Sequence, residues 1–145
     1  MLHSVDLSDY MLHNPPTIRP DADIFDAITM IIDLRISGLC VVDELGNLVG
    51  VLSELDCLEA TFTAMYDGRR DVGRVRDYMT PVDEVVVASL DDDIVDTARD
   101  MLSNRLRRRP VVQDGKLVGQ ITCRQLLRAV KNFSGVIFPS RTASG

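Results

Sequence analysis

The hydrophobic positions along this chain repeat in two passes of the same order. Helical spacing and strand-like runs alternate within each pass, which predicts a short strand, a helix, two strands and a closing helix. In the first pass the segments are Thr17–Ile18, Ile24–Ile31, Leu39–Val42, Leu48–Leu52 and Leu55–Met65. In the second pass they are Val85–Val87, Ile94–Leu102, Pro110–Val112, Leu117–Ile121 and Leu126–Phe133. The pattern therefore predicts an α+β protein built by internal duplication.

Matching residues support the duplication. An offset of 70 positions places Ile24 on Ile94, and an offset of 69 places Gly50 on Gly119. The offset changes between the two long strands, where the second copy has Asp114-Gly115, a dipeptide that favours a two-residue hairpin turn. Acidic residues before each first helix predict N-terminal capping.

The closing helices carry apolar faces that are predicted to pack on the sheets and to be available to a second subunit. These faces consist of Leu55, Leu58, Phe62 and Met65 in the first copy and of Leu126, Leu127, Val130 and Phe133 in the second.

The predicted domain boundaries follow the repeat. Residues 1–9 form an N-terminal segment, 10–66 the first repeat, 67–77 a linker, 78–133 the second repeat and 134–145 a flexible C-terminal tail. The linker is rich in glycine and charge, and the tail lacks periodicity. With 145 residues and 46% hydrophobic residues, the chain has enough apolar material for two small repeats with a shared core.

Composition narrows the classes of partner. A formal net charge of −6 argues against nucleic-acid binding, because affinity for a polyphosphate grows with each cation that neutralises a phosphate. No apolar run approaches the ~20 residues that span a bilayer, and no signal-peptide core is present, so we expect a cytoplasmic protein without a membrane partner. Cys40, Cys57 and Cys123 form no CxxC pair and are expected to be buried small hydrophobes.

A polar helix start follows the second long strand of each copy. Ser53 and Asp56 have the spacing of a capping box, in which two side chains satisfy backbone N–H groups, and Thr122 and Gln125 occupy the matching positions. The alternative is a ligand site, because a helix N-terminus attracts an anion and a carboxylate can accept hydrogen bonds from two vicinal hydroxyls. An amide can accept at only one of its two termini. Only the first copy has the carboxylate.

The strongest local charge consists of Arg105, Arg107, Arg108 and Arg109, directly before Pro110. Strand alternation predicts that Arg107 and Arg109 share one face and that Arg108 lies on the other. The simplest interpretation is a solvated surface run.

Catalytic and metal motifs do not occur in the sequence. There is no GxSxG, HExxH or P-loop pattern, and the acids at Asp91–Asp93 are expected to cap a helix rather than to bind a metal. The residues therefore predict neither an enzyme nor a metal site.

The repeated order of elements, with the motifs GVLSELD (Gly50–Asp56) and GQITCRQ (Gly119–Gln125), resembles the cystathionine-β-synthase (CBS) domain. GLCVV in the first copy and RRRPVV in the second belong to the same resemblance, which covers residues 10–133. Two such domains in tandem form a Bateman module. The resemblance implies two β-α-β-β-α repeats packed about a pseudo-twofold axis, with two clefts that in many family members bind adenosine-containing ligands.

The resemblance also assigns residues to those clefts. AMP, ADP or ATP is expected on Thr17, Gly38, Leu39, Cys40, Ser53 and Asp56, with Arg107 and Arg108 at its phosphate. A weaker second cleft is expected at Val87, Pro110, Thr122 and Gln125. Ser37 and Gly38 stand where the second copy has its two arginines, and Cys40 stands in place of Pro110, which leaves the entry to that strand less rigid.

A CBS pair implies a regulatory module that needs no cofactor or metal. Nucleotide binding would be transmitted to a partner protein that the sequence does not identify, and a homodimer is expected through the helices. The alternative is a ligand-free structural or interaction module in which Ser53 and Asp56 only cap a helix.

Overall fold

The computed structural model describes residues 6–137, with side chains for residues 6–132. These residues form two compact units. The repeat-1 unit contains residues 15–86 and 114–117, and the repeat-2 unit contains residues 6–14, 87–113 and 118–137. The α+β class and the duplicated order of elements are confirmed.

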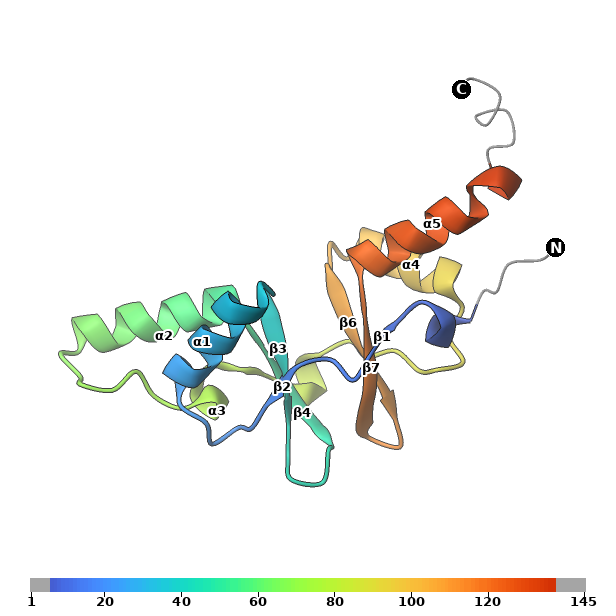
Figure 1. Ribbon diagram of the computed structural model, residues 1–145. Coiled ribbons are helices and arrows are strands. Elements are labelled where there is room, and N and C mark those ends of the chain that lie inside the picture. The colour runs from blue at the N-terminus through green and yellow to red at the C-terminus, as the bar shows by residue number, and fades with distance from the viewer. Residues whose placement is uncertain (1–5, 138–145) are drawn as a thin grey trace, which may run out of the picture. The chain divides into compact units, whose positions relative to one another are not determined.

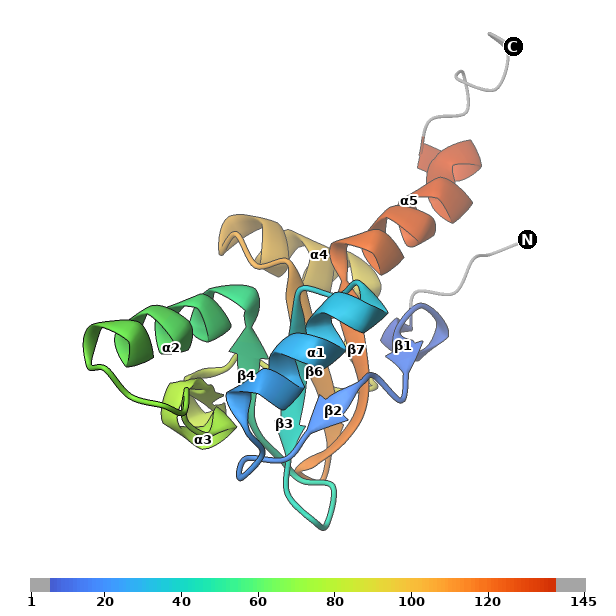
Figure 2. The same cartoon turned by 60° about the vertical axis from the view of Figure 1, so that its left-hand side comes forward.

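The repeat-1 unit is a four-stranded sheet with helices on one face (Figure 1). Its elements are β2 (Thr17–Ile18), α1 (Ile24–Leu34), β3 (Gly38–Val42), β4 (Leu48–Ser53), α2 (Glu54–Tyr66), α3 (Val75–Tyr78), β5 (Thr80–Pro81) and the 3-10 turn η2 (Val82–Glu84). The strand order is β2-β3-β4-β5; β2 runs parallel to β3, and the other neighbours are antiparallel. Figure 2 shows α1 lying across β2 and β3.

The core of the repeat-1 unit lies between this sheet and its helices. It contains Ile18, Ile24, Ala27, Ile31, Leu39, Val41, Leu52, Cys57, Ala60, Val72 and Val75. The buried residues of α2 are the small ones Cys57, Ala60 and Ala64, which let the helix approach closely. The larger face of α2, formed by Leu55, Leu58, Phe62 and Met65, is exposed. The prediction that this face packs on the sheet is therefore wrong.

The repeat-2 unit has a three-stranded sheet in the order β1-β7-β6. Its elements are η1 (Leu7–Asp9), β1 (Leu12–His13), α4 (Ile94–Ser103), β6 (Arg108–Gln113), β7 (Lys116–Thr122) and α5 (Cys123–Ile137). Its core contains Leu7, Met11, Ala88, Ile94, Met101, Val111, Ile121, Leu126 and Ala129. The predicted turn between β6 and β7 is confirmed, because Asp114 and Gly115 have φ values of 52° and 80°.

The folded units differ from the sequence repeats in two short segments, each of which folds with the other repeat. Residues 6–14 precede the first repeat, yet Leu7 is fully buried in the repeat-2 unit and β1 pairs with β7. Residues 114–117 close the hairpin of the second repeat but belong to the repeat-1 unit, where the Leu48 N–H donates to the Gly115 carbonyl at 3.0 Å. Pairing with β1 covers an edge of β7 that would otherwise be open.

Two element predictions differ from the structure. Val85–Val87 forms no strand, because η2 ends just before it and the Val85 N–H donates back to Val82; only Ala88 pairs, in a single bridge to Val111. Helix α5 continues to Ile137 and so enters the predicted tail, whose remaining residues 138–145 lie outside the described part. The side chain of Phe133 is also outside it.

Candidate functional site

Asp56 lies in the first turn of α2, directly after β4. The Ser53 N–H donates to Asp56 Oδ2 at 2.8 Å, and the Asp56 N–H donates to Ser53 Oγ at 3.1 Å, so the predicted capping box is present. Within the described residues, Asp56 Oδ1 has no hydrogen-bond partner in the protein, and the side chain is only half-buried. Because a carboxylate has about four acceptor positions, capping leaves it able to accept further hydrogen bonds.

The strands place other predicted site residues beside this helix start. Thr17 pairs with Cys40, and Gly38 pairs with Ser53. Leu39 belongs to the core on the helix side of the sheet. Since successive side chains on a strand alternate between faces, Gly38 and Cys40 face away from that core, and Thr17 shares their face. Leu39 has only its backbone to offer a ligand.

The matching helix start in the repeat-2 unit has a different acceptor. Gln125 Oε1 accepts hydrogen bonds from the Thr122 N–H at 3.0 Å and from the Thr122 hydroxyl. A carbonyl oxygen has two lone pairs, so both are used within the cap, and the amide nitrogen of Gln125 can only donate. Val87 supplies no polar group and Pro110 is buried. Unlike Asp56, Gln125 therefore has no side-chain oxygen acceptor left outside its cap.

The three arginines of the repeat-2 unit occupy different environments. Arg107 is exposed and lies before β6, Arg108 opens the strand and is half-buried, and Arg109 is buried against Asp100 of α4. The prediction that Arg107 and Arg109 share a strand face is wrong, because β6 begins only at Arg108. The Arg109–Asp100 pair was not predicted. The sequence did contain a signal for this pair. The repeat offset of 70 places Arg109 on Leu39 and Asp100 on Met30, so both charges replace apolar residues of the first copy.

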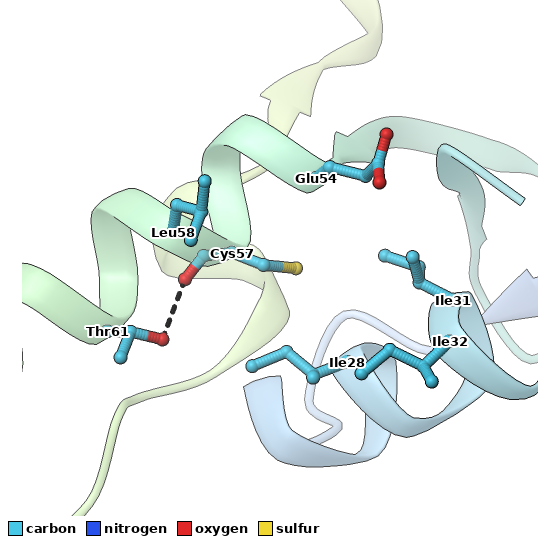
Figure 3. Close-up of a pocket in the computed structure, with 7 residues that line it drawn as sticks. All are labelled: Ile28, Ile31, Ile32, Glu54, Cys57, Leu58 and Thr61. Atoms are coloured by element: carbon cyan, nitrogen blue, oxygen red, sulfur yellow. Dashed lines mark hydrogen bonds between the residues drawn. The ribbon is translucent and has the colours of Figure 1, made fainter.

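An apolar groove lies between α1 and α2 and has a volume of about 230 Å³. In Figure 3 the sulfur of Cys57 points from α2 towards Ile28 and Ile31 of α1, and Glu54 stands at the rim. Burial first, and then the negative charges of Asp56 and Glu54, together raise the pKa of Cys57 to about 11. The thiol therefore stays protonated at neutral pH.

The repeat-2 unit has an equivalent groove between α4 and α5, with a volume of about 340 Å³. It is lined by apolar residues together with Arg105, Arg107 and Cys123. Cys123 is exposed, so the prediction that all three cysteines are buried is wrong for this one. Its position matches that of Glu54 at the rim of the first groove.

The described residues give no sign of a metal site or of a membrane-spanning helix. In the part of the chain that the structure describes, no three side chains of His, Cys, Asp or Glu come together as metal ligands. No helix in that part is long and apolar enough to cross a bilayer.

Comparison with known proteins identifies relatives. The family model of the CBS domain matches residues 7–62 and 75–132. The crystal structure of CBSX2 in complex with AMP, a protein of Arabidopsis thaliana, has a TM-score of 0.79 and 30% identity over 90% of this chain and 99% of that chain. The CBS domain pair of protein MJ0100, solved with 5′-methylthioadenosine and S-adenosylmethionine, has a TM-score of 0.72 and 25% identity over 88% of this chain and 96% of that chain.

Curated relatives are longer than this chain. An uncharacterised protein of Methanocaldococcus jannaschii, MJ1225, is 30% identical over 120 residues, which are 83% of this chain and 41% of that protein. Chloroplastic CBSX2 is 29% identical over 85% of this chain and 62% of its own length. The chain thus spans less than two thirds of either relative.

Proposed function

The chain belongs to the CBS domain family as a tandem pair, and from this premise we propose that it is a regulatory module that binds an adenosine-containing nucleotide such as AMP, ADP or ATP. The observation that carries the proposal is Asp56, a half-buried carboxylate at a helix N-terminus whose Oδ1 is not used by the cap. The solved relatives add support, because AMP, methylthioadenosine and S-adenosylmethionine all contain adenosine.

In the proposed site, Asp56 accepts hydrogen bonds from the two ribose hydroxyls. Thr17 and the backbone of Gly38–Cys40 contact the nucleoside, and Ser53 orients Asp56 through the capping box. Arg107 and Arg108 of the second repeat bind the phosphate through charge-assisted hydrogen bonds. Two cations at this point offset the repulsion between the phosphate and a chain with a net charge of −6. The weaker site consists of Val87, Pro110, Thr122 and Gln125. It has no carboxylate, and the first repeat has Ser37 and Gly38 in place of the two arginines.

No chemical step is part of the proposal. Occupancy acts on a partner protein by favouring one arrangement of the module, and the effect is limited by the difference in nucleotide affinity between the arrangements. We also propose a homodimer formed through the exposed helix faces.

The proposed ribose contact predicts a specific loss. Asp56→Asn should weaken AMP binding by about tenfold or more, because hydrogen bonds to a charged group contribute roughly 1.5–3 kcal/mol, while the amide oxygen can still accept from the Ser53 N–H. Isothermal titration calorimetry measures the change. Asp77→Asn is the matched control, since Asp77 accepts from the Arg74 N–H at 3.1 Å in the first turn of α3. Equal losses in both variants would contradict a direct ribose contact.

The phosphate contact predicts a dependence on the ligand. Replacing Arg107 and Arg108 together by alanine should weaken AMP binding by about tenfold or more and leave adenosine binding unchanged, because only AMP has the charged group. Arg76→Ala, an exposed arginine of α3, serves as the control. An equal loss for AMP and adenosine would show that the two arginines act on the fold or on the nucleoside instead.

A second candidate function is a ligand-free interaction module. The complete capping box favours it, because Ser53 and Asp56 then already have a structural role. A thermal shift assay with adenosine, AMP, ADP, ATP and S-adenosylmethionine separates the two functions. A ligand at one hundred times its dissociation constant should stabilise the protein by about 2.7 kcal/mol. No shift with any of these compounds would favour the interaction module.

A further inference from the structure

The groove between α4 and α5 lies wholly within the repeat-2 unit. Its volume of about 340 Å³ falls at the lower end of the range of small-molecule sites, which is roughly 300–1,000 Å³. Most of the residues that line it are apolar, namely Ala98, Met101, Leu102, Leu106, Leu126 and Leu127. Leu102 and Leu127 are 78% and 68% exposed. An apolar ligand in the groove would therefore remove leucine surface from water, which favours binding.

The groove also carries positive charge. Arg105 and Arg107 line it, and none of the described residues around it is acidic. Both arginines are exposed, and neither guanidinium has a hydrogen-bond or ion-pair partner among the described residues. Each can therefore donate to a bound anion, and the planar guanidinium group matches the geometry of a carboxylate. The groove thus combines apolar walls with two cations that the protein itself does not neutralise.

The equivalent groove between α1 and α2 lacks this combination and is smaller, with a volume of about 230 Å³. Three positions matched by the repeat offsets differ: the second copy has Ala98 for Ile28, Arg107 for Ser37 and Cys123 for Glu54. These changes shorten a wall side chain, add a cation and remove an acid. Arg35, the counterpart of Arg105, does not line the first groove. All of these differences favour an anion with an apolar part in the second groove alone.

We propose that the α4–α5 groove binds a single-chain fatty acid, with its alkyl chain against the apolar walls and its carboxylate on Arg105 and Arg107. A short chain suits the volume of the groove and buries its leucine surface, whereas a purely polar anion would leave that surface in water. The inference goes beyond nucleotide binding and does not rest on it. Because Arg107 also belongs to the proposed phosphate contact, the test is built on Arg105 and Ala98.

Titration of the full chain followed by NMR tests the site, with octanoate, octanol and acetate as probes. Octanoate should shift backbone amide signals of α4 and α5, octanol should bind about tenfold more weakly, and acetate should cause no shift, because only octanoate has both a chain and a charge. Arg105→Gln should lower the octanoate affinity about tenfold and leave octanol unchanged. Arg35→Gln is the matched control, since both arginines have a left-handed backbone, with φ values of 55° and 57°, and it should bind octanoate like the wild type.

Two further variants separate the apolar contact from the charge. Ala98→Ile introduces the side chain of the first groove and should weaken octanoate and octanol alike, whereas Cys123→Glu introduces its acid and should weaken octanoate alone. Circular dichroism shows whether each variant is folded, and AMP binding by Arg105→Gln should equal that of the wild type. No octanoate shifts, shifts centred on α1 and α2, equal losses for Arg105→Gln and Arg35→Gln, or full binding by Ala98→Ile would overturn the fatty-acid site whether or not AMP binds.

Discussion

Asp100→Ala should lower the free energy of unfolding by about 3 kcal/mol, the largest effect that we expect from a single substitution in this chain. The side chain of Arg109 is 6% exposed and forms an ion pair with Asp100, which is 49% exposed. Removing the carboxylate leaves a buried guanidinium without its counter-charge. Urea unfolding followed by circular dichroism measures the loss. Arg109→Leu should cost much less, because the carboxylate that it leaves behind can reach water.

The first repeat supplies the matched control for this ion pair. Met30 and Leu39 occupy the equivalent positions; Leu39 is in the core of the repeat-1 unit, and half-buried Met30 packs against that core. The double variant Asp100→Met/Arg109→Leu should therefore be as stable as the wild type or more stable, since well-packed apolar residues often replace a buried ion pair without loss. Arg109 Nε also lacks a hydrogen-bond partner among the described residues, which adds to the cost of the native pair. A double variant as unstable as Asp100→Ala would contradict this explanation.

Gly50→Ala should destabilise the protein by about 2–3 kcal/mol. A Cβ atom at Gly50 would lie 2.6 Å from the Thr80 carbonyl oxygen and 2.8 Å from Met79 Sδ, so β5 would have to move away from β4. Without this contact, alanine in a strand would instead stabilise by about 0.4–1 kcal/mol through the unfolded state. The sign of the change in thermal unfolding therefore tests the close approach of the two strands.

Gly119 is the matched position in the second repeat. A Cβ atom there would lie 2.5 Å from Met11 Sδ, the end of a flexible side chain, and 3.0 Å from the Leu12 carbonyl oxygen. Gly119→Ala should therefore cost about 1 kcal/mol, less than Gly50→Ala, because methionine can adopt another rotamer. If the order of the two losses is reversed, the packing of β5 on β4 is not what requires glycine at residue 50.

The repeat could be predicted from the sequence to a large extent because periodicity is a local property. Apolar residues at helical spacing located α1, α2, α4 and α5, and the Asp114-Gly115 dipeptide located a hairpin turn. The capping box at Ser53 and Asp56 could also be predicted from the sequence, because its two side chains accept hydrogen bonds from backbone groups only three residues away. The comparison of Asp56 with Gln125 likewise needed only the sequence.

Tertiary structure decided which surfaces and charges are buried. Leu55, Leu58 and Phe62 have helical spacing, but the face that packs on the sheet is set by small Cys57 and Ala60, because close packing selects shape as well as hydrophobicity. The run of arginines does not distinguish Arg109 from its neighbours, because its burial depends on Asp100 in another helix. Only the repeat offset, which places Arg109 on apolar Leu39, pointed to it.

The sequence by itself therefore determined the duplication, most of the order of elements and the difference between Asp56 and Gln125 at the two matching helix starts. Only the tertiary structure decided that residues 6–14 fold with the second repeat, that the side-chain oxygen of Gln125 is used within its own cap, and that Leu55, Leu58, Phe62 and Met65 of α2 are exposed. The physical reason is that local spacing specifies secondary structure, whereas burial and pairing depend on contacts between residues far apart in the chain.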